Sequence, residues 1–222
     1  MTRRSRLTPA WFVAAVVAFR GSQAMTLTPK QRASTLALTG ESTAALKLQL
    51  LRTASGTSNG VRATPRETST VEAIVQELEN RREEPFPVFT GTWDLLFSTS
   101  PGSSSGKLGP FVGAVTQEFL DETDFVNAVE LGPLRVALRA QRKPIKDTSY
   151  RVTFKEMSFA LFGQELMSKS ITGGGVWKVR YVDSDLRIMD TPSLFVLTRQ
   201  PKDKVSLMDV LQDPARFMED ED

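Results

Sequence analysis

From residue 91 onward, apolar and polar residues alternate along the chain with a period of two. Trp93, Leu95 and Phe97 share one face of residues 91–99, and residues 134–141 repeat the pattern with Arg135 and Arg139 on the polar face. Such alternation is typical of antiparallel sheets with one buried and one solvated face. It predicts eight short strands, at residues 91–99, 115–121, 124–131, 134–141, 150–155, 177–181, 186–190 and 194–199.

Turn residues separate these strands, and no helical pattern lies between them, so a parallel α/β fold is excluded. We expect a mainly β protein in which residues 91–200 form one antiparallel β-barrel. A barrel of eight strands either fills with side chains or holds one small ligand. The apolar residues expected to point inward are Trp93, Leu95, Phe97, Phe125, Val129, Leu134, Val136, Leu138, Val152, Phe154, Trp177, Val179 and Tyr181, with Asn127 on the same face.

Before residue 91 the period of the apolar positions changes to that of helices, which makes the expected fold α+β overall. Residues 42–51 have a helix-forming composition. A second helix is expected to begin with a capping box at Ser69 and Glu72 and to end at Pro85 and Pro87. The apolar stripe of this helix should pack on the barrel, since its other face is acidic. The stripe consists of Val71, Ile74, Val75 and Leu78.

The charges are distributed unevenly. Residues 1–40 hold six of the 28 basic residues and none of the 26 acidic ones, so the rest of the chain has a net charge of −4. A net-negative body lacks the cationic surplus on which nucleic-acid affinity depends. Nucleic acid is therefore not an expected partner, and the high pI belongs to the first 40 residues.

These first 40 residues have the layout of a targeting leader. Three arginines precede an apolar run at residues 11–19, and Ser22-Gln23-Ala24 offers small residues for cleavage. Residues 1–24 are therefore predicted to be a signal peptide, and residues 25–40, rich in Ser, Thr and basic residues, a transit-like segment. A plain secretory signal and a single mitochondrial or chloroplast transit peptide are the alternatives. The domain organisation then continues with a helical segment at 41–90, the barrel at 91–200, and a short helix with an acidic disordered tail at 201–222.

Cysteine and histidine are both absent from the chain. Their absence excludes disulfides, thiolate zinc sites, cysteine nucleophiles and Ser-His-Asp triads. No cofactor and no metal site is expected, and the hypothesis is that the protein is not an enzyme. Asp183 and Asp185 could form an acid/base pair, but their place between two strands favours a turn.

Five segments in order resemble the plastid lipid-associated proteins, the fibrillins. They are residues 78–80 (LEN), 91–99 (GTWDLLFST), 115–117 with 126–129, 181–188 (YVDSDLRI) and 194–197 (LFVL). The loop at residues 189–193 departs from the glycine-containing loop common in that family. The resemblance implies a plastid protein, associated with plastoglobules or thylakoids, that binds or coats apolar lipids such as quinones or carotenoids. It also implies a lipid ligand and a plastid membrane surface as partners, with a protein of prenyl-lipid metabolism as a further candidate.

Trp93 in a Gly-x-Trp strand is similar to the first strand of lipocalins, in which the indole closes one end of the barrel against an arginine. Arg187 and Arg199 are the candidates for this barrel closure. A guanidinium over an indole contributes about 0.5 to 2 kcal/mol. The residues predicted to line the ligand site are Trp93, Leu95, Phe97, Phe125, Asn127, Val136, Phe154, Trp177 and Tyr181.

Three hypotheses for function follow. The first is a lipid carrier or coat without catalytic residues. The second is a barrel-type isomerase or cyclase acting on an apolar substrate, for which Tyr150, Tyr181 or a carboxylate must face the cavity. The third is an accessory protein that docks on a prenyl-lipid enzyme.

Overall fold

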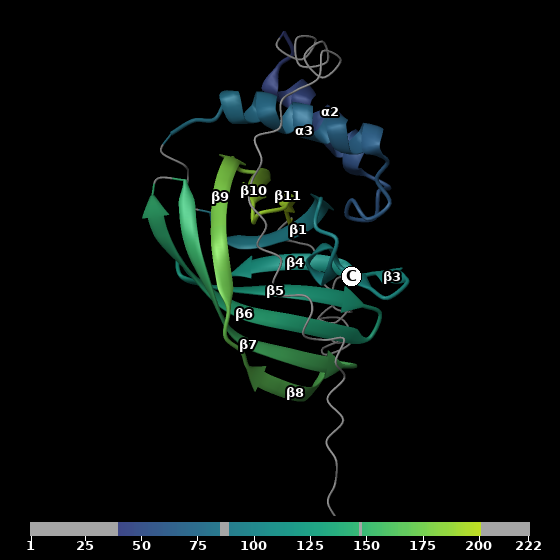
Figure 1. The fold of residues 1–222 in the computed structure, drawn as a ribbon, viewed down its shortest axis with the longest axis vertical. Helices are drawn as coiled ribbons and strands as arrows, with labels where there is room; N and C mark the ends of the chain where they lie inside the picture. The colour runs from purple at the N-terminus through teal and green to yellow at the C-terminus, as the bar shows by residue number, and fades with distance from the viewer. Residues whose placement is uncertain (1–39, 85–88, 147, 201–222) are drawn as a thin grey trace, which may run out of the picture.

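The computed structural model describes residues 40–84, 89–146 and 148–200. The expected leader and the expected tail helix lie outside these described residues. Within them, two α-helices precede a set of antiparallel strands (Figure 1). The elements are α2 (Thr43–Ala54), α3 (Pro65–Asn80), β1 (Gly91–Ser98), the 3-10 turn η2 (Ser103–Ser105), β2 (Lys107–Leu108), β3 (Phe111–Val112), β4 (Ala114–Phe119), β5 (Asp124–Leu131), β6 (Leu134–Lys146), β7 (Ser149–Leu161), β8 (Gln164–Ser170), β9 (Gly174–Val182), β10 (Leu186–Asp190) and β11 (Leu194–Arg199).

Eight strands pair in a ring. The order is β1-β4-β5-β6-β7-β9-β10-β11, and β11 pairs again with β1. Strand β7 closes the ring, because it pairs with β6 along its length and with β9 through residues 149–153. Every pairing is antiparallel. The predicted fold class, a mainly β antiparallel barrel preceded by two short helices, is confirmed.

The sequence pattern did not predict strand β8. It pairs with the second half of β7 outside the ring, and all of its residues are exposed. Strands β6 and β7 are also longer than predicted, at 13 residues each. In Figure 1 they extend with β8 below the rest of the barrel, on the side away from the helices. The barrel therefore has one long, partly unpaired wall.

Helix α3 begins five residues earlier than predicted, counted from N-cap to N-cap. Its N-cap is Thr64, whose hydroxyl accepts a hydrogen bond from the Glu67 amide while the Glu67 carboxylate accepts one from the Thr64 amide. Pro65 occupies the first helical position, where its missing N–H costs nothing. The predicted capping box at Ser69 is therefore wrong, because Thr64 and Glu67 form the capping box and Ser69 lies inside the helix. The helix also ends at Asn80, before Pro85.

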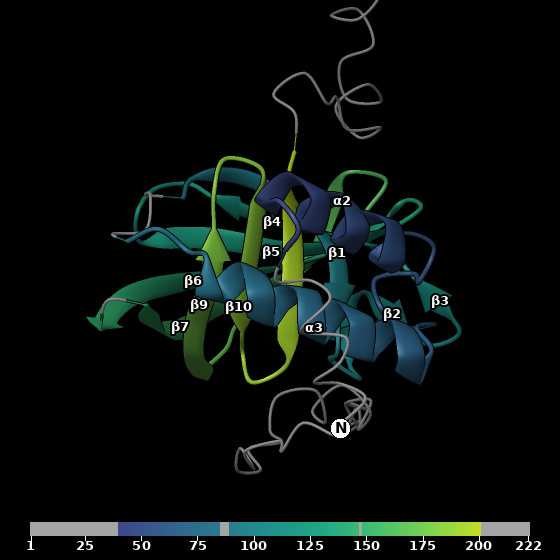
Figure 2. The same ribbon diagram turned by 90° about the horizontal axis from the view of Figure 1, so that it is seen from above.

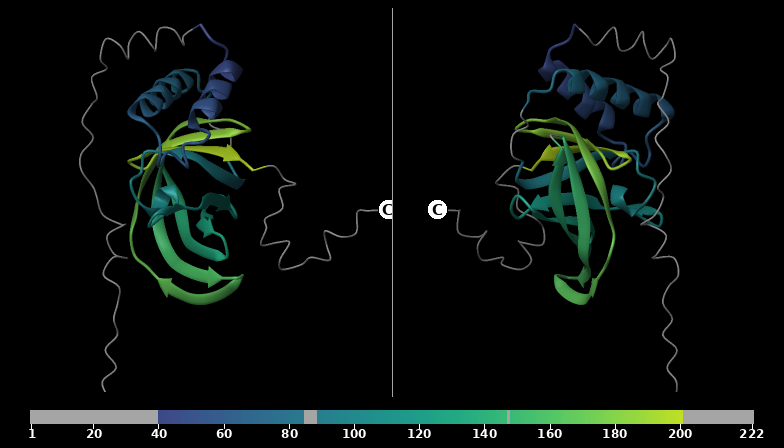
Figure 3. Two further views of the ribbon diagram at one scale, coloured as in Figure 1. Left: turned by 90° about the vertical axis from the view of Figure 1, so that its right-hand side faces the viewer. Right: turned by 60° about the vertical axis from the view of Figure 1, so that its left-hand side comes forward.

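Both helices lie across the outside of the barrel, over β9, β10, β11 and the end of β1 (Figures 2 and 3). Their apolar stripes and the outer faces of these strands form one buried cluster. The predicted packing of the second helix on the barrel is thus confirmed. The cluster contains Leu46, Leu50, Ala54, Val71, Ile74, Val75, Leu78, Phe97, Tyr181, Leu186, Ile188, Leu194 and Val196.

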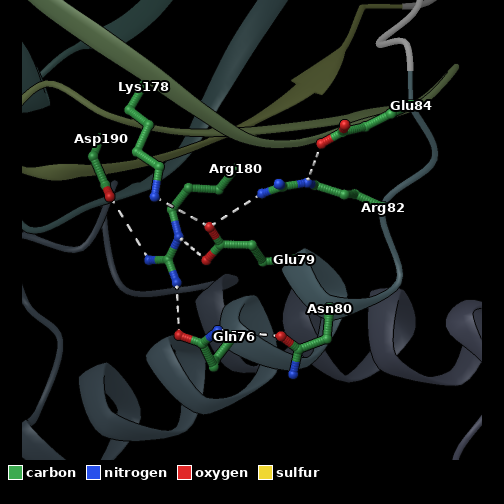
Figure 4. Close-up of polar contacts among 8 residues, drawn as sticks. All are labelled: Gln76, Glu79, Asn80, Arg82, Glu84, Lys178, Arg180 and Asp190. Carbon is green, nitrogen blue, oxygen red and sulfur yellow. Dashed lines mark hydrogen bonds and ion pairs between the residues drawn. The ribbon is translucent and has the colours of Figure 1, made fainter. Parts of the chain in front are cut away.

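Ion pairs at the edge of this cluster join α3 to β9. Glu79 lies 2.8 Å from Arg180 Nε and 3.4 Å from Lys178 Nζ (Figure 4). Arg180 also reaches Asp190, at 3.8 Å, and Gln76. Because the side chain of Glu79 is only 13% exposed, its bond to Arg180 is partly desolvated and contributes more than a surface pair.

Candidate functional site

Two β-bulges decide which side chains point into the barrel. In β1 the register against β11 shifts between Leu95 and Phe97, so Leu95 faces the interior and Phe97 faces the helices. In β9 a shift of the same kind leaves Val179 inside and turns Tyr181 outward. The prediction that Phe97 and Tyr181 point inward is therefore wrong. An extra residue in one strand moves every later side chain to the opposite face.

Aromatic rings fill much of the interior. The ring centroids of Phe119 and Phe125 lie 5.5 Å apart, and those of Phe125 and Trp177 lie 4.7 Å apart. Phe89, from the segment before β1, packs edge-on against Phe119 at 5.3 Å. The inner cluster contains Phe89, Trp93, Leu95, Phe119, Phe125, Ala140, Val152, Trp177, Val179, Val182, Met189, Phe195 and Leu197, with Val115, Tyr150 and Phe154 packed against it.

One end of the barrel, which we call the arginine end, is marked by Trp93, Arg142, Arg187 and Arg199. The guanidinium of Arg199 lies 4.3 Å from the centre of the Trp93 ring, and that of Arg187 lies 5.0 Å from it. Trp93 itself is fully buried and donates its indole N–H to the carbonyl of Thr90. Both arginines that the sequence nominated thus contact this indole.

Arg187 and Arg142 are buried inside this end of the barrel. Their guanidinium carbons lie against the same two rings, at 4.7 and 4.1 Å from Phe119 and at 5.0 and 4.2 Å from Phe89. Arg142 donates to the backbone carbonyls of Phe89 and Glu122. Burial lowers the pKa of Arg142, and it lowers the pKa of Arg187 more strongly, assisted by repulsion from the other two arginines.

A line of polar side chains leads away from Arg187. Its Nη2 donates to the side-chain oxygen of Gln117, and Gln117 Nε2 donates to the side-chain oxygen of Asn127 at 2.6 Å. Gln117 is buried, whereas Asn127 is half-buried. The line therefore runs from the arginine end toward the more accessible half of the interior.

That half lies at the opposite end of the barrel, which we call the hairpin end, where the β5–β6 and β7–β8 turns lie. Val136 pairs with Val129 on one side and Phe159 on the other, and Leu138 pairs with Met157. These five side chains share a face and are all half-buried. The rim of this end carries exposed apolar side chains at Leu161, Phe162, Leu166 and Met167.

Most of the predicted ligand-lining residues face the interior of the barrel, and two lie outside it under the helices. Trp93, Leu95, Phe125, Phe154 and Trp177 belong to the inner cluster or pack against it. Asn127 and Val136 lie on the same inner face toward the hairpin end, by their pairing with Gln117 and Val129. Phe97 and Tyr181 lie under the helices instead.

Sequence reasoning did not identify Arg142, Gln117, Phe89 or Phe119. For Arg142 a signal existed, because it continues the inward alternation of β6 by one step beyond Ala140. The strand was predicted to end at Gln141, whereas β6 continues to Lys146. Phe89 gave no signal, because it lies before the first predicted strand.

Two hollows in the described part of the chain lie away from the arginine end. One, of about 320 Å³, lies between the start of α3 and the end of β1 and is lined by residues that include Thr68, Phe97 and Lys107. The other, of about 360 Å³, lies at the β7–β9 crossing beside Gly174. Neither is lined by the buried arginines or by Asn127.

Of the groups that an isomerase or cyclase would need, Tyr181 lies under the helices and Asp183 lies in a turn, whereas Tyr150 faces the interior of the barrel. The Tyr181 hydroxyl donates to Asp183 at 2.8 Å, and burial raises the pKa of this tyrosine. Asp183 accepts from the amides of Asp185 and Leu186, which confirms the predicted turn, and forms an ion pair with Lys47 of α2. Tyr150 is half-buried and packs against the inner cluster, with the centre of its ring 5.4 Å from the Arg142 guanidinium.

No group of three acidic side chains that could hold a metal ion occurs in residues 40–84, 89–146 and 148–200. In the same residues, neither helix has the length and the apolar character needed to cross a membrane.

Fold and site together define an antiparallel barrel covered on one side by two helices. Its interior is aromatic, with two buried arginines at one end and a half-buried apolar face toward the other. The PAP_fibrillin family model matches residues 44–198, which is more than half of the chain. The chain therefore belongs to the PAP/fibrillin family of plastid lipid-associated proteins. Comparisons with curated proteins and with solved structures give no match.

Proposed function

We propose that this protein binds a lipid at the inner face of its barrel, entered from the hairpin end, and does not catalyse a reaction. The observation that carries the proposal is the half-buried apolar face of β5, β6 and β7 formed by Val129, Val136, Leu138, Met157 and Phe159. Covering apolar surface is favourable by about 25 cal/mol per Å², so a few hundred Å² binds a lipid chain. Quinones and carotenoids are the apolar lipids that family membership suggests.

The hairpin end would also be the side that contacts a lipid surface. Leu161, Phe162, Leu166 and Met167 are between 37% and 73% exposed and lie together on the β7–β8 hairpin. Phe162 holds a positive φ of 50° in the turn, a conformation that is costly for a bulky residue. An exposed apolar patch on a hairpin supports contact with a plastoglobule or thylakoid surface.

The test of lipid binding is mass spectrometry of lipid that co-purifies with the full tagged chain from plastid membranes. Val136→Asp, on the inner face, should lose the lipid. Ser158→Asp, on the outer face of the same wall opposite Ala137, should retain it. Equal lipid content in both folded variants would contradict binding at the inner face, and absence of lipid from the wild-type protein would contradict binding altogether.

Residence in the plastid is proposed from the family and from the acid-free first 40 residues. Fractionation of cells expressing the C-terminally tagged chain tests it. The processed protein should appear in the plastid fraction. Tagged protein in the culture medium with an N-terminus at Met25 would instead indicate plain secretion.

A further inference from the structure

The hydrogen bonding of Arg187 is incomplete. Its side chain is fully buried, its Nη2 donates to Gln117, and its Nε and Nη1 donate to no partner in the described part of the chain. Buried donors of a charged group are expensive to leave unpaired. The aromatic rings around the guanidinium stabilise its charge but offer no oxygen to accept these hydrogen bonds.

The buried arginines also lack an ion-pair partner, although Glu122 and Asp121 lie near enough to attract the charge of Arg142. No carboxylate forms an ion pair with Arg187 or Arg142 within the described residues, and Arg142 Nη1 has no partner there either. The two guanidinium groups share Phe89 and Phe119 as neighbours, and Arg199 adds a third positive charge at the same end. Buried charges in proteins are normally paired. What this end of the barrel lacks is an anion with at least two acceptor oxygens.

The Gln117 side chain marks where such an anion would sit. Its oxygen is the one side-chain acceptor that Arg187 uses among the described residues, and its amide points toward Asn127 at 2.6 Å. Asn127 is half-buried and shares its face with Val129 and, across the strand pair, with Leu138. A chain lying on the apolar face from the hairpin end therefore meets Asn127 first, Gln117 next and the arginine last.

We propose that the ligand of this barrel is a long-chain lipid with a carboxylate head, whose two oxygens accept from Arg187 Nη2, in place of Gln117, and from one of the two Arg187 nitrogens that are now unpaired. The proposal rests on the proposed lipid-binding function and names the chemical class of the ligand. The hydrocarbon chain lies along Val129, Val136 and Leu138 toward the hairpin end. Gln117 and Asn127 turn aside and donate their amide N–H groups to the bound head group.

The first test compares three probes on the full chain at about pH 8, where a carboxylic acid is ionised. Palmitate, the alcohol of the same chain length, and acetate each compete with a fluorescent fatty acid. Palmitate should bind at least about tenfold more tightly than the alcohol, because charge-assisted hydrogen bonds are the stronger ones. Acetate should not compete, since the apolar face anchors the chain. Displacement by acetate at the concentration of palmitate would indicate a site for free anions and overturn the proposal.

The second test places the missing carboxylate inside the protein. Gln117→Glu supplies Arg187 with an internal anion, so the preference for palmitate over the alcohol should disappear and the melting temperature should rise. Ser158→Asp adds the same negative charge on the outer face of β7, opposite Ala137, and should change neither the palmitate preference nor the melting temperature. Arg187→Met should also abolish the preference while the alcohol still binds. If Arg187→Met does not fold, Gln117→Glu still decides the question.

The outcomes separate the two proposals. Equal binding of palmitate and the alcohol by the wild-type protein would overturn the carboxylate site and leave lipid binding intact. A palmitate preference that survives in folded Gln117→Glu would overturn the role of Arg187. Failure of both long-chain probes to bind would overturn lipid binding in the barrel itself.

Discussion

The guanidinium of Arg199 lies 4.3 Å above the centre of the Trp93 ring, and the Cα atoms of the two residues are paired across β1 and β11. Arg199 also donates to the carbonyls of Thr90 and Ser184, so it joins the segment before β1 to the β9–β10 turn. On the inner side Arg187 lies 5.0 Å from the same ring. The indole thus contacts one exposed and one buried cation at the pairing of the first strand of the ring with the last.

Trp93→Ala should therefore destabilise the protein far more than Arg199→Met. Removing a buried indole costs about 3–5 kcal/mol, whereas an exposed cation–π contact contributes about 0.5–1 kcal/mol. Urea unfolding followed by circular dichroism measures both. Arg139→Met, an exposed arginine on β6, serves as the control and should have no effect. Equal losses for Arg199→Met and Trp93→Ala would show that Arg199 does more than cover the ring.

The alternation of apolar residues was enough to predict the eight strands of the ring, because one buried face repeats every second position. It could not predict the bulges, since an inserted residue leaves no mark in the local composition. Leu96 and Phe97 are as apolar as Leu95, so the sequence alone does not show where the strand changes face. Strand β8 was missed for a related reason: all of its residues are exposed, so it has no buried face to reveal it.

Phe97→Ala tests the face assignment. Because Phe97 is 1% exposed and packs in the cluster under α2 and α3, the loss should be about 3–5 kcal/mol of unfolding free energy. Amide hydrogen exchange should accelerate first in the two helices. A folded Phe97→Ala protein should bind lipid as the wild type does, since the side chain lies outside the barrel. Loss of lipid binding without faster hydrogen exchange in the helices would contradict this assignment and indicate that Phe97 faces the interior of the barrel.

Two carboxylates near the helices should respond oppositely to neutralisation. Burial alone would raise the pKa of Asp183, but hydrogen bonds from Lys47, two backbone amides and Tyr181 outweigh it and hold this pKa below its ordinary value. Burial raises the pKa of Asp190, and attraction to Arg180 and Lys178 only partly opposes it. A carboxyl whose pKa is lower in the folded protein than in the unfolded chain stabilises the fold when the pH is above the unfolded-state pKa. This stabilisation is lost as the pH falls through the folded-state pKa. A raised pKa has the opposite sign, so the charged form of Asp190 is disfavoured at neutral pH.

Asp183→Asn should therefore cost about 1 kcal/mol at neutral pH, and the loss should shrink as the pH falls below about 4. Asp190→Asn should leave the stability at neutral pH unchanged or slightly higher. Thermal unfolding of both variants across this pH range measures the two effects. A loss at Asp190→Asn as large as that at Asp183→Asn would mean that its ion pair with Arg180 outweighs the burial of the carboxylate.

The buried arginines mark the limit of sequence reasoning in the site. Arg187 could be named, because it faces Trp93 as a lipocalin-type arginine would. Its lack of a carboxylate partner could not be foreseen, since the side chains around Arg187 come from distant parts of the sequence. Arg142 lay one residue beyond the predicted end of its strand. A strand is predicted to end where the alternation of apolar residues ends. Because Arg142 is a charged residue at an inward position, it ended this alternation before the strand itself ended.

The closure of the barrel between β7 and β9 depends on a close backbone approach at Gly174. A Cβ atom built on this glycine would lie 2.0 Å from the carbonyl oxygen of Val152, whereas one built on Gly175 would meet nothing within 4 Å. Gly174 pairs with Thr153 and Gly175 with Val152, so both glycines belong to the same short ladder. They therefore form a matched pair in which only one position lacks space for a methyl group.

Gly174→Ala should destabilise the protein by about 1–3 kcal/mol, as overpacking against a backbone atom does. Gly175→Ala should have little effect, or stabilise slightly by restricting the unfolded chain. Urea unfolding measures the difference, and hydrogen exchange should locate it at residues 149–153 of β7. Equal stability of the two variants would show that β9 can shift away from β7 without cost. That result would mean that the pairing of β7 with β9 contributes little to the stability of the barrel.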